Sequence, residues 1–180
     1  MDNPYAPAGK AQKYARVERE RRWLLAGPPD PVTATVEAEV TDVYFTGTRL
    51  RLRRIVDRRG NRNSVYKLTQ KVEQTDAIRL VTNTYLSEAE YELFAKLDGD
   101  VICKIRYSVP PFGVDVFLPP LNGLVLAEAE FDSDEAMTAG VPPRDATAEV
   151  TDDARFTGGR LVATTRDELL EILAEFDLGL

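Results

Sequence analysis

The feature that most constrains how this chain folds is an alternation of charged and uncharged residues that recurs in five short segments. Side chains of a β-strand point alternately to its two faces, so residues two apart in sequence share a face. In four of the five segments the residues between the charges are mostly apolar. The alternating charges are Glu18, Glu20, Arg22, Arg49, Arg51, Arg53, Lys67, Lys71, Lys104, Arg106, Glu128 and Glu130. The pattern predicts strands with one charged and one apolar face.

Turn residues divide the chain into eight β-rich segments and three helical ones. Predicted strands cover residues 14–25, 33–45, 48–56, 63–72, 78–86, 100–108, 113–118 and 124–131. Predicted helices cover 133–137, 166–176 and 87–97, the last of which opens with a capping box of Ser87 and Glu90. About eight strands with few helices fit a mainly β (α+β) fold, an eight-stranded antiparallel β-barrel tunnel with helices packed outside.

The charged faces can point either into water or into the barrel. An ordinary sandwich turns its apolar faces inward and leaves such charges in solvent. Here several apolar faces need a cover, and helices outside the barrel are the elements that can supply it, so we predict that the charges line the lumen. Unpaired buried charge is very costly, so the lumen must be wet and receive a polyanion with metal ions. For residues 33–45 and 78–86 the inward face stays open, and Glu37, Glu39 and Arg79 are candidates for it.

An eight-stranded barrel is wide enough for one small elongated ligand, and arginine makes bidentate contacts with phosphate. The carboxylates are grouped as Glu18 with Glu20 and Glu128 with Glu130, with Asp115 between strand ends. Such hard oxygen ligands suit Mg²⁺ or Mn²⁺. A metal-activated water is then the simplest nucleophile.

Composition excludes several other chemistries. The 180 residues contain no histidine and one cysteine, Cys103, so a Ser-His-Asp triad, a histidine-ligated metal site and an internal disulfide are excluded. The net charge of −7 argues against nucleic acid or an anionic membrane as partner. Residues 1–13 are polar and lack the apolar stretch of a signal peptide. We expect a flexible segment over 1–13, one domain over 14–180, and a cytoplasmic monomer or homodimer.

Taken in order, these segments resemble the CYTH superfamily, also called triphosphate tunnel metalloenzymes. The family's N-terminal ExExK is similar to Glu18-Arg19-Glu20-Arg21-Arg22, with arginine where lysine is usual. Residues 48–53, 66–71, 104–106, 114–131 and 149–151 look like its later arginine, lysine, KxR, acidic and EVT-like segments. The resemblance spans residues 15–163 and implies an eight-stranded antiparallel tunnel. Family activities are hydrolysis of inorganic or thiamine triphosphate and cyclisation of ATP.

The resemblance also implies roles for individual residues. The expected ligands of two Mg²⁺ or Mn²⁺ ions are Glu18, Glu20, Asp115, Glu128 and Glu130. The expected phosphate contacts are Arg49, Arg51, Arg53, Lys67, Lys71, Lys104 and Arg106. The expected catalytic residues are Glu18, Glu20, Arg22 and Lys71.

Two considerations favour inorganic triphosphate as the substrate. The predicted lumen is charged throughout, and no obvious aromatic or polar group for adenine or thiazole recognition stands out. The alternatives are a thiamine triphosphatase or class IV-like adenylate cyclase on the same site, and a polyphosphate- or nucleotide-binding module without turnover.

Overall fold

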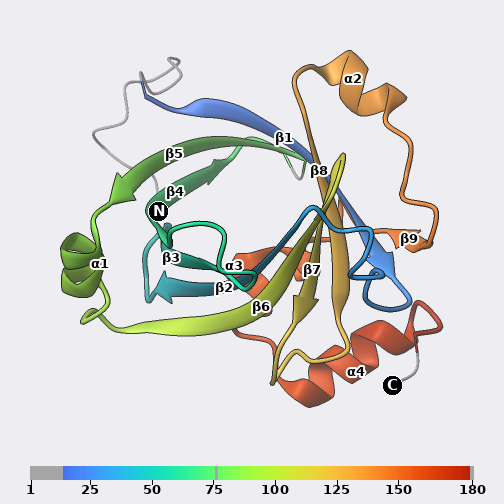
Figure 1. Ribbon diagram of the computed structural model, residues 1–180. Helices are drawn as coiled ribbons and strands as arrows, with labels where there is room; N and C mark the ends of the chain where they lie inside the picture. The colour runs from blue at the N-terminus through green and yellow to red at the C-terminus, as the bar shows by residue number, and fades with distance from the viewer. Residues whose placement is uncertain (1–13, 76, 179–180) are drawn as a thin grey trace.

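Antiparallel strands close into a barrel (Figure 1). The computed structural model describes residues 14–75 and 77–178. Within that part of the chain the eight barrel strands are β1 (Arg16–Leu25), β2 (Val36–Phe45), β3 (Leu50–Asp57), β4 (Val65–Glu73), β5 (Ile78–Leu86), β6 (Gly99–Val109), β7 (Phe112–Phe117) and β8 (Val125–Phe131). Their order around the barrel is β1-β5-β4-β3-β2-β6-β7-β8, and the pairing of β8 with β1 closes the ring. The predicted fold class is confirmed, whereas the prediction for residues 1–13 lies outside the described residues.

The other elements surround this ring. They are β9 (Ala146–Glu149), which pairs with β1, the 3₁₀ helix η1 (Ala154–Phe156), and the helices α1 (Glu88–Phe94), α2 (Asp134–Ala139), α3 (Gly158–Leu161) and α4 (Arg166–Ala174). Figure 1 shows α1, α2 and α4 around the outside of the barrel. The predicted capping box of Ser87 and Glu90 starts α1. Among the described residues, no helix has the length and apolar character needed to span a bilayer.

Helix α1 covers the apolar outer face of β3 and β4. Leu52, fully buried, clusters with Phe45 and with Tyr91 of α1. The ring of Tyr66 lies 4.8 Å from that of Tyr91, centroid to centroid. The apolar side of the arginine strand therefore faces outward, against a helix, as the alternation predicts.

The outer face of β1, β7 and β8 is covered differently, by the segment that contains α2 and β9. Trp23 is 1% exposed and packs edge-on against Phe112, with 5.7 Å between ring centroids. Arg21 lies over the same indole and donates two hydrogen bonds to Glu149 of β9. It also donates to the carbonyl of Gly140 after α2. Arg21 thus anchors this outer cover to β1.

One end of the barrel is closed by apolar packing. Leu24 and Leu126 continue the inward faces of β1 and β8 beyond the charged residues, and they are buried with Phe117. Phe156 of η1 and Leu161 of α3 complete this cluster, together with residues of α4. The prediction of a lumen charged throughout is therefore wrong at this end, where the barrel is a closed cup.

Candidate active site

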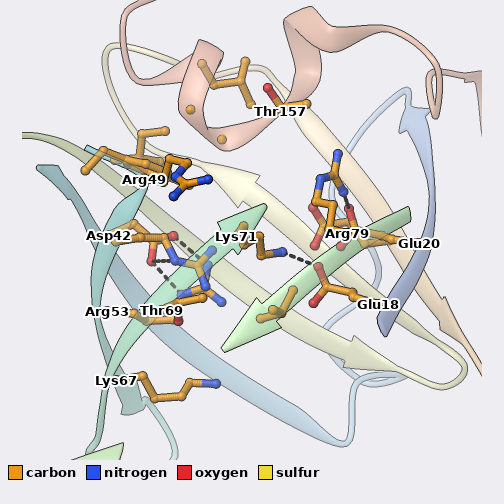
Figure 2. Close-up of a pocket in the computed structure, with 18 of the residues that line it drawn as sticks. Glu18, Glu20, Asp42, Arg49, Arg53, Lys67, Thr69, Lys71, Arg79 and Thr157 are labelled. Carbon is orange, nitrogen blue, oxygen red and sulfur yellow. Dashed lines mark hydrogen bonds and ion pairs between the residues drawn. The ribbon is translucent and has the colours of Figure 1, made fainter. Parts of the chain in front are cut away.

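A cavity of about 620 Å³ occupies the barrel (Figure 2). Over the described part of the chain, ten cationic and six carboxylate side chains line it, an excess of four positive charges. The cations are Arg16, Arg22, Arg49, Arg51, Arg53, Lys67, Lys71, Arg79, Lys104 and Arg106, and the carboxylates are Glu18, Glu20, Asp42, Glu73, Glu128 and Glu130. A chain of net charge −7 thus concentrates positive charge in its interior. Such a cavity attracts polyanions.

The carboxylates of β1 lie on one wall and are held by cations of β4 and β5. Glu18 and Glu20 are 6% and 7% exposed. Lys71 Nζ donates to Glu18 Oε2 at 2.5 Å, and Arg79 Nη1 donates to Glu20 Oε1 at 3.3 Å (Figure 2). Both carboxylates therefore face the cavity and are held by ion pairs with β5, the neighbouring strand, and with β4 beyond it.

The carboxylates of β8 extend the same wall. Glu130 pairs with Glu20 across the β1–β8 ladder, so both side chains are on the inner face. Arg106 Nη2 donates to Glu128 Oε2 at 2.6 Å, and Arg16 Nη2 donates to Glu130 Oε2 at 2.8 Å. Two adjacent strands thus present four carboxylates to one region of the lumen.

Across the cavity, Asp42 of β2 holds the arginines of β3. Arg53 Nε and Nη2 donate to its two oxygens at 2.6 and 2.7 Å, and Arg51 Nε lies 3.5 Å from Asp42 Oδ1. Burial would raise the pKa of Asp42, but the charges of Arg53 and Arg51 outweigh it and hold the pKa well below its ordinary value. Asp42 is therefore the ionised counterion that fixes these guanidinium groups.

Asp115 of β7 plays the same part for the cations of β6. It is fully buried, and it accepts two hydrogen bonds from Arg106, each at 2.6 Å, and one from Lys104 at 2.5 Å. Burial would raise its pKa, but these two cations keep the pKa well below its usual range. The sequence predicts a metal ligand at this position. The structure instead places both oxygens in ion pairs beneath the cavity surface.

Arg22 is directed toward the closed end of the barrel. Its side chain is 3% exposed, and its Nη2 and Nη1 donate to the carbonyls of Thr151 at 2.7 Å and Phe156 at 3.3 Å. Burial is the main reason that the pKa of Arg22 is lowered, against the opposing charge of Glu20. Arg22 lines the cavity but also ties β1 to the segment that closes it.

The remaining predicted cations lie at the edge of the cavity. Arg49, just before β3, is exposed, whereas Lys67 of β4 is partly buried. Burial lowers the pKa of Lys67, and the charges of Arg53 and Arg51 lower it further. Figure 2 shows Arg49 on the side of the pocket nearer Thr157, and Lys67 on the opposite side.

The structure also resolves the strands whose inward face the sequence left open. Arg79 of β5 and Asp42 of β2 line the cavity. Glu37 instead forms an ion pair with Arg58 on the outer side of β2, and Glu39 is exposed on the same face. A signal for Asp42 was present in the sequence, since it is the one charged residue on a face otherwise made of Ala38, Val40 and Tyr44.

The closing segment brings further residues to the cavity that sequence reasoning missed. Thr157, between η1 and α3, lines it together with Gly158 and Gly159, the first two residues of α3. A Cβ on Gly158 would overlap the Tyr44 hydroxyl and lie 2.9 Å from its Cζ. A larger residue at this position would therefore displace the Tyr44 side chain of β2.

The cavity carboxylates have the oxygen donors that Mg²⁺ and Mn²⁺ prefer, so their chemistry fits these ions. Across the described residues, however, no group of three or more acidic, histidine or cysteine side chains is gathered as a metal site. Each of Glu18, Glu20, Glu128 and Glu130 instead contacts a lysine or an arginine. A metal ion would therefore have to replace these ion pairs.

A closed ring of eight antiparallel strands is the barrel that the CYTH resemblance implies, and the structure has it. Two of the similar solved structures are of NE1496. The first is the crystal structure of the inorganic triphosphatase NE1496, at 28% sequence identity and a TM-score of 0.54, covering 82% of this chain and 95% of that one. The second, of the hypothetical protein NE1496, has 28% identity and a TM-score of 0.53 and covers 82% of this chain and 99% of that one. Neither a protein-family model nor a curated protein matches this chain.

Proposed function

We propose that this protein hydrolyses a linear triphosphate, with inorganic triphosphate as the preferred substrate and Mg²⁺ or Mn²⁺ as cofactor. The observation that carries the proposal is the excess of four positive charges in a cavity closed at one end, beside a wall of four carboxylates. The similarity to a protein described as an inorganic triphosphatase supports it.

The cationic walls would bind and orient the phosphate chain. Arg51, Arg53, Lys104 and Arg106 are fixed by buried carboxylates, so little conformational entropy is lost when they bind phosphate oxygens. Arg49, Lys67 and Lys71 add charge from the neighbouring parts of the same surface. Positioning and charge neutralisation of this kind supply most of the catalysis of phosphoryl transfer.

The carboxylate wall would hold the divalent ions, two in our proposal. The candidate ligands are Glu18, Glu20, Glu128 and Glu130, which face the cavity, whereas Asp115 lies beneath it. When bound, such ions lower the pKa of a water molecule and neutralise phosphate charge.

Lys71 and Arg22 would act through their contacts. Lys71 holds Glu18 at 2.5 Å and would turn to a phosphate oxygen once Glu18 has another partner. Arg22 would keep the closed end of the cavity in place through the carbonyls of Thr151 and Phe156.

A phosphate-release screen tests the proposal. Inorganic triphosphate, thiamine triphosphate, ATP and pyrophosphate would each be tested with Mg²⁺, with Mn²⁺ and with EDTA. We expect metal-dependent release of orthophosphate, fastest from inorganic triphosphate. Cyclic AMP formed from ATP with Mn²⁺ would instead identify a cyclase, and tight triphosphate binding without any product would identify a binding module.

Glu130→Gln is the sharpest variant, because Glu130 is exposed at the cavity edge and its loss should not unfold the protein. We expect activity to fall by at least about 100-fold, since even indirect partners of a metal are worth 10–100-fold. Glu39→Gln, an exposed carboxylate on the outer face of β2, is the matched control and should keep full activity. Full activity in Glu130→Gln would contradict the proposed role of these glutamates as metal ligands.

A further inference from the structure

A neutral pair of side chains lies within the cationic wall of the cavity. Thr69 of β4 and Asn83 of β5 are directly opposite each other in the β4–β5 ladder, and both line the cavity. Thr69 is 1% exposed, whereas Asn83 is exposed. Figure 2 shows Thr69 on β4 between Lys67 and Lys71. The pair therefore places one buried and one accessible polar group among the cations.

The amide of Asn83 is held in one orientation. The Thr69 hydroxyl donates to Asn83 Oδ1 at 2.7 Å. An asparagine side chain has one acceptor oxygen and two N–H donors, and this bond occupies the oxygen. Within the part of the chain that the structure describes, the amide nitrogen of Asn83 makes no hydrogen bond. Its two N–H groups are therefore left for a ligand of the cavity that this side chain lines.

The neighbours of the pair carry positive charge. Arg51 of β3 is opposite Thr69 in the β3–β4 ladder. Lys67 and Lys71 precede and follow Thr69 on the inner face of β4. Burial lowers the pKa of Lys67, and the charges of Arg53 and Arg51 lower it further. Because the wall is this crowded with cations, another cation would add repulsion, whereas an amide donor adds a hydrogen bond to an anion without adding charge.

The orientation of the amide suits a phosphate chain. The non-bridging oxygens of a triphosphate accept hydrogen bonds, so N–H groups attract them and an amide oxygen repels them. The Thr69 hydroxyl occupies that amide oxygen, and the donors are the part of Asn83 that remains accessible. A cross-strand pair of this kind also stabilises a sheet, but that role does not require Asn83 to be accessible from the cavity.

We propose that Asn83 is a further phosphate-binding residue, whose amide N–H groups donate to an oxygen of the phosphate chain. Thr69 is the positioning residue that keeps the amide in the donating orientation. The inference rests on the proposed function, because it takes a linear triphosphate as the ligand of this wall. It adds a neutral donor to a set of phosphate contacts that otherwise consists of arginines and lysines.

Binding of inorganic triphosphate, measured by titration calorimetry in EDTA, tests the Asn83 contact without turnover. Since a hydrogen bond to a charged group is worth roughly tenfold or more in affinity, Asn83→Ala should raise Kd by about tenfold. Asn83→Asp places a negative charge at the same position and should raise Kd further. The matched control is Asn61→Asp, which adds the same charge at an exposed position outside the cavity lining and should change Kd by less than about twofold.

Variants of Thr69 test whether its effect passes through Asn83. Thr69→Val removes the hydroxyl at nearly constant volume, so the amide can turn and Kd should rise at least about twofold. Thr69→Ser keeps the hydroxyl and should bind as wild type does. In the Asn83→Ala background, Thr69→Val should have no further effect, because the group that it positions is already absent. Circular dichroism checks that each variant is folded, and Thr69→Ala takes the place of Thr69→Val if the latter does not fold.

The outcomes separate this contact from the proposed hydrolysis. An unchanged Kd in Asn83→Ala overturns the contact, while metal-dependent phosphate release by wild type still supports hydrolysis. A loss in Thr69→Val that persists in the Asn83→Ala background overturns the positioning role of Thr69. An Asn83-dependent affinity in a protein that releases no phosphate with any metal overturns hydrolysis and leaves the contact standing. A wild type that binds no triphosphate overturns the contact and the phosphate-binding role of the wall together.

Discussion

Removal of the Asp42 charge tests how the barrel tolerates so many buried cations. Asp42 is 1% exposed, and both of its oxygens accept hydrogen bonds from Arg53. Asp42→Asn keeps the shape of the side chain and leaves Arg53 and Arg51 without their counterion. Breaking a buried ion pair by removing one partner costs about 3–5 kcal/mol. We expect at least about 3 kcal/mol, because the asparagine oxygen accepts only one of the two Arg53 hydrogen bonds and its amide N–H faces the other donor.

Thermal unfolding followed by circular dichroism at neutral pH measures this loss. The unfolding entropy of a chain of this length is about 0.4 kcal/mol/K, so the free-energy loss should lower Tm by at least about 8 °C. The matched control is Glu37→Gln on the outer face of the same strand, where Glu37 pairs with half-exposed Arg58 at 2.8 Å. A pair of this kind is worth at most about 1 kcal/mol, so Tm should fall by less than about 3 °C.

A bound polyanion should compensate for the missing carboxylate. Triphosphate added without divalent metal supplies negative charge to Arg53 and Arg51, so it should raise the Tm of Asp42→Asn more than that of wild type. The reasoning is refuted if Asp42→Asn loses no more stability than Glu37→Gln. Equal shifts with triphosphate in variant and wild type would show that these arginines do not contact the ligand.

Three further expectations concern the closed end and the titrating groups. Gly158→Ala should cost about 1–3 kcal/mol in thermal unfolding, because its Cβ would overlap the Tyr44 hydroxyl. Gly159→Ala, with nothing within 4 Å of its Cβ, is the control, and equal losses would contradict the contact. Folding lowers the pKa of Asp115, so its contribution to the free energy of unfolding is complete above its unfolded-state pKa and is lost as the pH falls below about 4.5. In urea unfolding, the free energy of unfolding of Asp115→Asn should therefore fall less steeply with decreasing pH than that of wild type. The lowered pKa of Lys67 should rise when triphosphate binds, so calorimetry in two buffers at alkaline pH should detect proton uptake that Lys67→Arg abolishes.

Strand alternation was enough to predict the inner face of the barrel, because that signal is local. Arg51 and Arg53 are two residues apart, and any strand that contains them places both on one face. The apolar side of the same strand needs cover, and α1 supplies it through Tyr91. A sandwich with these charges in water would also have buried Leu52. One strand alone therefore could not decide between the two folds, and the prediction depended on several strands together.

The closed end was missed because nothing local marks it. Gly158 and Gly159 are poor helix formers, yet they begin α3, and β9 has four residues only. Their positions depend on contacts far apart in sequence, such as Arg22 with the carbonyls of Thr151 and Phe156. A single sequence gives no measure of such contacts.

The carboxylates of the barrel fall into two groups that residue type alone does not distinguish. Asp42 and Asp115 are buried, and each holds two cations from the neighbouring strand. A metal ion cannot replace these partners without burying unpaired cations, which is costly. Under the proposed function, the glutamates of β1 and β8, which line the cavity, would exchange their lysine and arginine partners for a metal ion. In that proposal the two aspartates keep the cations of β3 and β6 in place in every state of the site, and the glutamates are the carboxylates that change partner.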